Sequence, residues 1–256
     1  MSWAARRQIL YICIVLLFLG AVSAYPIYAI FIKHTPTCND GIQNQDEKAI
    51  DCGGICPRAC VDQVVAQPLV EWARIFPVSG SVYNLVAYVQ NPNVTYVGNP
   101  TRYLFKVFDK DNVLIDVVEN TVAIPPTHTF PIFEQGFDAG KRIPNHVTFE
   151  FTEPVVWFSY KGEHTEFAVS GEVLVNATSS PRLDALITNK TTNVFKNIET
   201  VAILYDNTGN AVQVSRTYIP ILADNNGKNV TFTWPTSLAR EVTTVEIIPK
   251  VPFDNK

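Results

Sequence analysis

The feature that most constrains this chain is a run of 24 residues without a charged side chain, Ile9–Ile32. At about 1.5 Å of rise per residue, a helix over this run is about 36 Å long, enough to cross a hydrocarbon core of about 30 Å with some tilt. We therefore predict a transmembrane helix over residues 9–32 after a cytoplasmic tail over residues 1–8. Everything after the helix is then tethered at one side of a membrane.

The flanks of the run predict its orientation. Arg6 and Arg7 precede it without an acidic neighbour, whereas Lys33 is the charged residue that follows it. Because Lys and Arg accumulate on the cytoplasmic side, we expect the N-terminus in the cytoplasm and the bulk of the chain outside it. The chain is then a single-pass protein of the cell membrane.

A cleaved signal peptide is the alternative, because residues 22–24 (Val-Ser-Ala) have the small side chains of a signal peptidase site. Cleavage would leave a strongly apolar new N-terminus at Tyr25, so we favour a retained anchor. In a retained span we expect a kink at Pro26, an apolar role for Cys13, and an outer aromatic belt of Tyr25, Tyr28 and Phe31.

Residues 34–256 are sufficient for two domains of about 100 residues, each with a core. The chain has 20 Lys and Arg against 24 Asp and Glu; three of the basic residues precede residue 34, so this part carries 17 against 24, a formal charge of −7. It contains no basic run, which argues against nucleic acid as a partner.

The other four cysteines fall in one window, which we assign to a cysteine-rich module over residues 34–62: Cys38, Cys52, Cys56 and Cys60. An even number beside a membrane span, on its predicted outer side, indicates two disulfides in an oxidising compartment, with three pairings open. A zinc site built from the same thiolates is the alternative.

The window from Cys38 to Cys56 reads C-x-DGI-x-N-x-x-E-x-x-x-DCGG-x-C. It resembles a short module of many secreted and cell-surface proteins that precedes or separates β-sandwich domains. Five oxygen-bearing side chains crowd a loop too short for a core, and Ca²⁺ takes about six to eight oxygen ligands. The candidate calcium ligands are therefore Asp40, Asn44, Asp46, Glu47 and Asp51, and the alternative is a metal-free loop of solvated acids.

From Val64 onward, apolar and polar residues alternate, and turn-forming residues interrupt the alternation. This pattern predicts an all-β fold of the β-sandwich type, which we divide into two tandem sandwiches over residues 63–168 and 169–256, with the three later tryptophans in the cores. The clear strand candidates are residues 83–90, 101–108, 112–119, 146–151, 200–205, 211–218, 229–234 and 243–248, and the tryptophans are Trp72, Trp157 and Trp234.

An internal repeat supports two similar sandwiches. The segment Phe105–Asp109 returns 97 residues later as Ala202–Asp206, each time as a strand followed by an aspartate that can close an Asx-type turn. Upstream, each copy has a strand that ends in asparagine, Asn91 and Asn189.

The residues Phe105-x-Val107-Phe108-Asp109 and Leu204-Tyr205-Asp206 resemble the motif of FxLYD domains, which are small immunoglobulin-like sandwiches of prokaryotic surface proteins. The second copy departs from the motif, because Ala202 stands where the first has Phe105. The motif residues are turn and core formers, so we expect Phe108 and Tyr205 in the cores. The resemblance implies extracytoplasmic binding or spacing, with no catalytic residues.

No hydrolase, metalloprotease or nucleotide-binding motif is present in the sequence. We predict a non-catalytic stalk, adhesion or assembly protein that binds a protein or envelope partner, with homo-oligomerisation open and no cofactor except the candidate calcium. The alternatives are a membrane-tethered glycan-acting enzyme or its accessory, and a subunit of a larger envelope or filament assembly. Asn-x-Thr matches begin at Asn93, Asn176, Asn189 and Asn229 and leave glycosylation open.

Overall fold

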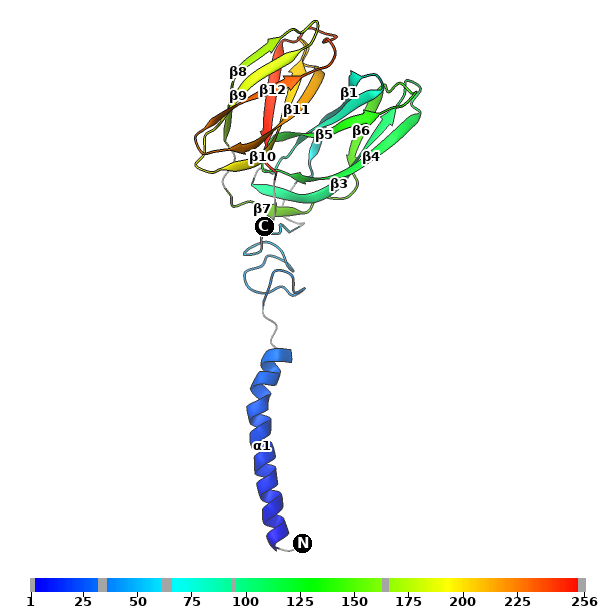
Figure 1. Ribbon diagram of the computed structural model, residues 1–256. Coiled ribbons are helices and arrows are strands. Elements are labelled where there is room, and N and C mark those ends of the chain that lie inside the picture. The colour runs from blue at the N-terminus through cyan, green and yellow to red at the C-terminus, as the bar shows by residue number, and fades with distance from the viewer. Residues whose placement is uncertain (1–2, 32–35, 61–65, 94, 163–165, 253–256) are drawn as a thin grey trace. The chain divides into compact units, whose positions relative to one another are not determined.

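The computed structural model describes residues 3–31, 36–60, 66–93, 95–162 and 166–252. The chain divides into two compact units, Met1–Cys56 and Pro57–Lys256, and each is described by itself. The first unit contains a helix and most of the cysteine-rich module, and the second contains all strands (Figure 1).

Helix α1 spans Trp3–Phe31. Its stretch Arg6–Ala24 has a mean hydropathy of 2.0, and none of it is buried within the protein. A helix that is apolar on all sides and unburied suits lipid rather than water, and its length is sufficient to span a membrane. A signal sequence would have the same two properties.

The helix begins earlier than the predicted span, so Arg6 and Arg7 lie on it. The physical reason is that neither Pro nor Gly separates them from the apolar run. Pro26 lies inside the helix. Lys33 and the side chains of Tyr25 and Phe31 lie outside the described residues.

Two antiparallel sheets form the first sandwich (Figure 1). One has the strand order β1-β2-β5; the other has the order β4-β3-β6, and β7 pairs with the start of β3. The strands are β1 (Leu69–Ser79), β2 (Val82–Gln90), β3 (Tyr96–Phe108), β4 (Leu114–Ile124), β5 (Thr129–Asp138), β6 (His146–Phe151) and β7 (Trp157–Ser159).

The second sandwich repeats this connectivity. Its sheets have the orders β8-β9-β12 and β11-β10-β13. If β7 is left out of the count, the first, second and fifth strands of each sandwich form one sheet, and the fourth, third and sixth form the other. The strands are β8 (Phe167–Val175), β9 (Arg182–Asn189), β10 (Phe195–Tyr205), β11 (Ala211–Leu222), β12 (Gly227–Thr233) and β13 (Thr244–Lys250). The predicted all-β fold with an N-terminal apolar helix is confirmed.

Two predicted boundaries differ slightly from the structure. Strand β8 begins at Phe167, two residues before the predicted start of the second sandwich at residue 169. The predicted module over 34–62 ends earlier, because residues 57–59 lie along β7: the Ala59 N–H donates to the Trp157 carbonyl at 2.8 Å, and the Ser159 N–H donates to the Pro57 carbonyl at 2.6 Å. An extended segment beside a strand satisfies its backbone groups in this way.

Each sandwich has its own hydrophobic core. In the first, the fully buried Phe105 packs edge-on against Phe149 with ring centroids 5.0 Å apart. In the second, the corresponding cross-strand pair is Ala202 with Ile247, so the small residue of the repeat faces an aliphatic partner. Both cores also bury a tryptophan, as expected for Trp157 and Trp234. The same expectation for Trp72 is wrong, because its side chain is only partly buried and packs outside both cores.

Phe108 and Tyr205 were expected in these cores, and that prediction is wrong. Side chains alternate along a strand, so Phe105 and Val107 face inward while Phe108 faces outward, half-buried and stacked on the His146 ring with a centroid distance of 5.1 Å. Tyr205 is outward and half-buried in the same way.

A third buried cluster lies between the two sandwiches, where sheet β1-β2-β5 of the first packs on sheet β11-β10-β13 of the second. We call it the intersandwich interface. We call the two sandwiches together, residues 69–250, the head, which is a stack of four sheets. Its buried members are Phe76, Val86, Tyr88, Phe133, Val201, Ile203, Ala211 and Val214, and Trp72 stacks on Tyr88 at its margin.

The repeat shows how the interface faces differ from the two outer faces. By the 97-residue offset, the buried Ile203 corresponds to Lys106, whose ammonium pairs with the exposed Glu150 at 2.7 Å on the outer face of the first sandwich. The paired strands likewise set Val86 opposite Phe133 in the interface, and Asp184 opposite Thr231 on the outer face of the second sandwich.

Candidate functional site

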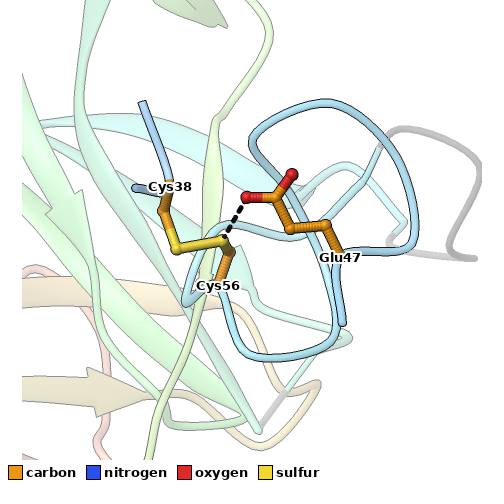
Figure 2. Close-up of side chains that lie close together, drawn as sticks. All are labelled: Cys38, Glu47 and Cys56. Atoms are coloured by element: carbon orange, nitrogen blue, oxygen red, sulfur yellow. Dashed lines mark hydrogen bonds between the residues drawn. A yellow bond between two sulfur atoms is a disulfide. The ribbon is translucent and has the colours of Figure 1, made fainter. Parts of the chain in front are cut away.

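The cysteine-rich module is held by disulfides. Cys38 and Cys56 are bonded with their Cα atoms 5.5 Å apart (Figure 2). Cys52 and Cys60 are also disulfide-bonded. The thiolate zinc site does not form, because all four sulfur atoms are taken up in disulfides. Cys13, on the apolar helix, is a free thiol.

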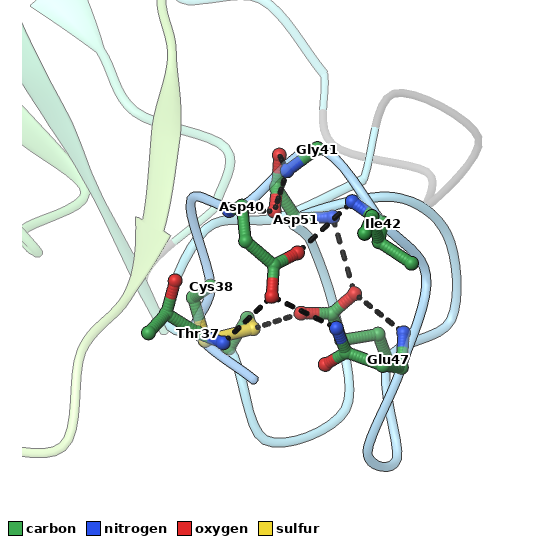
Figure 3. Close-up of a disulfide and its surroundings, with 9 residues drawn as sticks. Thr37, Cys38, Asp40, Gly41, Ile42, Glu47 and Asp51 are labelled. Atoms are coloured by element: carbon green, nitrogen blue, oxygen red, sulfur yellow. Dashed lines mark hydrogen bonds between the residues drawn. A yellow bond between two sulfur atoms is a disulfide. The ribbon is translucent and has the colours of Figure 1, made fainter. Parts of the chain in front are cut away.

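The acidic side chains of the module bind its own backbone (Figure 3). Asp51 accepts the N–H groups of Asp40 and Gly41 at 2.9–3.1 Å, and the buried Glu47 accepts those of Asn44 and Asp51 at 3.2–3.3 Å. The carboxylates therefore replace the core that a loop of this length cannot form.

The candidate calcium ligands do not gather their carboxylates at one point. In the described part of the chain, no three acidic side chains bring their oxygens within 4.8 Å of one another, and the group that meets this distance is Cys38, Glu47 and Cys56 (Figure 2). In this group, Cys56 Sγ lies 3.1 Å from Glu47 Oε1. The sulfur belongs to a disulfide and carries no hydrogen that it could donate to the carboxylate. Asp46 is exposed, and calcium binding stays a prediction.

The aspartates of the repeat close their turns as expected. Asp109 Oδ1 accepts the N–H groups of Asp111 and Val113 at 3.0 and 2.9 Å. The Val113 N–H, more than the Arg142 guanidinium, holds the pKa of Asp109 below its ordinary value. The Arg142 guanidinium approaches Asp109 Oδ2 at 2.6 Å.

The second copy reproduces this turn. Asp206 Oδ1 accepts the N–H groups of Thr208 and Asn210, both at 3.0 Å, and the Thr208 hydroxyl at 2.6 Å, while Arg240 lies 3.0 Å from Oδ2. The Thr208 hydroxyl contributes most to a strongly lowered Asp206 pKa. The arginines follow their aspartates by 33 and 34 residues, a part of the repeat that the sequence analysis missed.

The asparagine that follows β2, Asn91, and the one that ends β9, Asn189, are fully buried. Asn91 donates to the Pro125 carbonyl at 2.8 Å, and Asn189 donates to the carbonyls of Asn193 and Ala223 at 2.7 and 3.0 Å. Each side chain thus ties two loops together at the same end of its sandwich.

The Asn-x-Thr matches fall into two pairs. The Asn189 amide is buried, and the Asn93 amide exchanges hydrogen bonds with the backbone of Ala66, so neither side chain is free to carry a glycan. Asn176 and Asn229 are exposed.

A shared carboxylate joins the two sandwiches at the interface. Glu246 accepts the hydroxyls of Tyr88 and Tyr205, one on each oxygen and both at 2.7 Å. Burial, reinforced by this carboxylate, raises the pKa of both tyrosines well above the ordinary value of 10.0. Both hydroxyls therefore remain donors in neutral solution.

A charged cluster lies at the same interface. Arg216 Nη1 is 3.0 Å from Glu199 Oε1, and Lys250 Nζ is 2.7 Å from Oε2. Burial by itself raises the pKa of Glu199, but Lys250 and Arg216 outweigh burial and hold it below its ordinary value. Arg216 also donates across the interface to the Phe133 carbonyl and to Gln135, which gives the apolar contact a fixed register.

A cleft of about 490 Å³ opens where the two sandwiches meet. Residues 73–77 of β1, 145–147 at the start of β6, 210–212 at the start of β11 and the pair 239–240 line it. This size falls within the range of about 300–1,000 Å³ that is typical of ligand sites. Sequence reasoning did not find this cleft, because its walls come from four separate segments.

The comparisons with known proteins name no family. No protein-family profile matches the sequence, and no curated protein matches it. Among solved structures, red sea bream transglutaminase matches with 11% identity and a TM-score of 0.21, over 75% of this chain and 32% of that one. The chain therefore spans about a third of that enzyme, and a TM-score so low carries no argument about activity. The resemblances to FxLYD domains and to the cysteine-rich module stay predictions.

Proposed function

We propose that this protein is a single-pass membrane protein whose helix is retained as an anchor, with its N-terminus in the cytoplasm and its disulfide-bonded module and two-sandwich head outside. The head acts as a rigid, non-catalytic binding element for a protein or envelope partner. The observation that carries the proposal is the unburied apolar helix followed by disulfide-bonded cysteines, because disulfides persist in oxidising compartments.

The intersandwich interface supports a head that moves as one body. Apolar side chains of both sandwiches are fully buried in it, and tyrosine and arginine hydrogen bonds cross it. Relative motion of two domains is expected unless their contact is substantial and apolar, as it is here. A rigid head suits a role in presenting surfaces at a fixed geometry.

The test is membrane retention and topology of the full chain in its native cell. We expect the protein to resist carbonate extraction, to start before residue 25 by mass spectrometry, and to be digested by protease added to intact cells from which the outer layers have been removed. Ala24→Leu, which blocks signal peptidase cleavage, is the matched control and should change nothing. A soluble wild-type product that begins at Tyr25, turned into a membrane-bound one by Ala24→Leu, would overturn the proposal.

A further inference from the structure

The cleft between the sandwiches differs in charge from the rest of the head. Its walls carry two arginines and a histidine, Arg74, Arg240 and His146, and none of the described residues that line it is acidic. Residues 34–256 have 24 acidic against 17 basic residues, so a cleft without acids stands out. Because Arg240 is neutralised by Asp206 at 3.0 Å, the charge to explain is that of Arg74.

Arg74 is a half-buried cation with neutral partners. Nη1 donates to the Ala211 carbonyl at 3.0 Å, Nη2 donates to Asn210 Oδ1 at 2.9 Å, and the guanidinium carbon lies 5.6 Å from the centre of the Trp72 ring. Across the described residues, no carboxylate lies within ion-pair distance of it. A partly desolvated charge without a counter-charge is unfavourable, and an anion entering the cleft would relieve this.

The guanidinium keeps donors for such an anion. It has five N–H donors in a planar fork, and the two bonds to Ala211 and Asn210 occupy two of them. A carboxylate matches the geometry of this fork.

The shape of the cleft favours a peptide over a sugar. Five successive residues of β1 line it, and β1 is the terminal strand of its sheet, so its edge away from β2 forms no ladder with another described strand. Such an edge is the kind to which an extended chain can add. The aromatic residue of the wall, Phe76, is 3% exposed and offers no open ring face on which a sugar would stack. The remaining wall combines small and aliphatic residues, with Ala73, Ile75 and Val147 among them, and the two amides of Asn145 and Asn210.

We infer that the cleft binds an extended acidic peptide, with an Asp or Glu side chain of the peptide held by Arg74 and its backbone lying along the open edge of β1. This inference rests on the proposed function, because it names the surface and the chemistry of the partner that the head would bind. The peptide carboxylate supplies the counter-charge that no described residue of the protein places beside Arg74.

The test uses the full chain in lipid nanodiscs and measures fluorescence anisotropy of a labelled peptide of alternating valine and glutamate. We expect saturable binding that weakens with salt, and no binding of the same peptide with glutamine for glutamate. Arg74→Gln removes the charge while keeping an amide donor, and it should weaken binding by about tenfold or more, as expected for a charge-assisted contact.

Two further variants keep the test decisive. Asn145→Asp adds a negative charge to the wall at an exposed side chain, away from the bonds of Arg74, and should also weaken binding. Arg102→Gln, at a side chain that is 60% exposed and lies outside the cleft, is the control and should bind as the wild type does.

Equal affinity of the wild type, Arg74→Gln and Asn145→Asp, or equal binding of the glutamine peptide, would overturn the inference. Binding of an acidic polysaccharide such as polygalacturonate without binding of the peptide would overturn the choice of a peptide. A lack of peptide binding by protein that still resists carbonate extraction would refute the cleft assignment alone and leave the anchor intact.

Discussion

Replacement of Asn189 by alanine should destabilise the second sandwich far more than any surface change. The side chain is fully buried, donates to the carbonyls of Asn193 and Ala223, and accepts the N–H and hydroxyl of Thr191 at 3.0 and 2.9 Å. Removing it leaves two carbonyls and an amide without that partner, each at about 1–3 kcal/mol when water cannot reach them. Allowing for partial access of water in the cavity, we expect a loss of about 3–4 kcal/mol.

The assay is urea unfolding of the full chain in detergent, followed by the fluorescence of tryptophan. Trp234 is buried in the same sandwich as Asn189 and reports on it. Asn207→Ala, at an exposed turn residue, is the matched control and should lie within about 0.5 kcal/mol of the wild type. A loss below about 1 kcal/mol for Asn189→Ala would show that water satisfies the freed groups, and that the shared asparagine of both sandwiches is not a structural tie.

Three other predictions concern burial, the interface and pH. By urea unfolding, Phe105→Ala should cost about 3–5 kcal/mol and Phe108→Ala clearly less, because only the first is in the core; equal losses would contradict the inward and outward assignments. Ile203→Ala should cost about 2–5 kcal/mol and the corresponding Lys106→Ala less than about 1 kcal/mol, and the reverse order would refute the assignment of buried and outer faces. The folded-state pKa of Glu199 is lowered, so its contribution to stability is complete above the ordinary pKa of 4.5 and disappears as the pH falls through the folded-state pKa. Thermal unfolding between pH 3 and 6 should therefore show a smaller loss of stability on acidification for Glu199→Gln than for the wild type.

The sequence allowed the sandwiches to be predicted but not the way they meet. Buried and more exposed residues alternate along β3 and β9, because each strand is buried on one face. The aspartate turns and the asparagines at the strand ends indicated the repeat. Strands β2 and β10 are different: Leu85–Val89 and Val201–Leu204 are buried without alternation, because one face packs in the core and the other in the intersandwich interface. These continuous apolar runs were the available signal of a strand covered on both faces.

The cleft and its arginine could not be located in the same way. Arg74 lies 136 residues from Asn210 in the chain, and no local pattern relates the two. Arg142 and Arg240 could have been found from the sequence, because their spacing from Asp109 and Asp206 is nearly constant. A lone arginine in a loop is nevertheless a weak signal when its partner is not known.

The charged outer faces oppose the stacking of further sandwiches onto the head. Two unlike faces meet at the interface, and subunits that join through unlike faces can add to each other in an open-ended series. Lys106 and Glu150 at one end, and Asp184 at the other, stand where that series would need apolar side chains. The same charged residues therefore cap the two outer faces against stacking of a further sandwich through the contact seen at the interface.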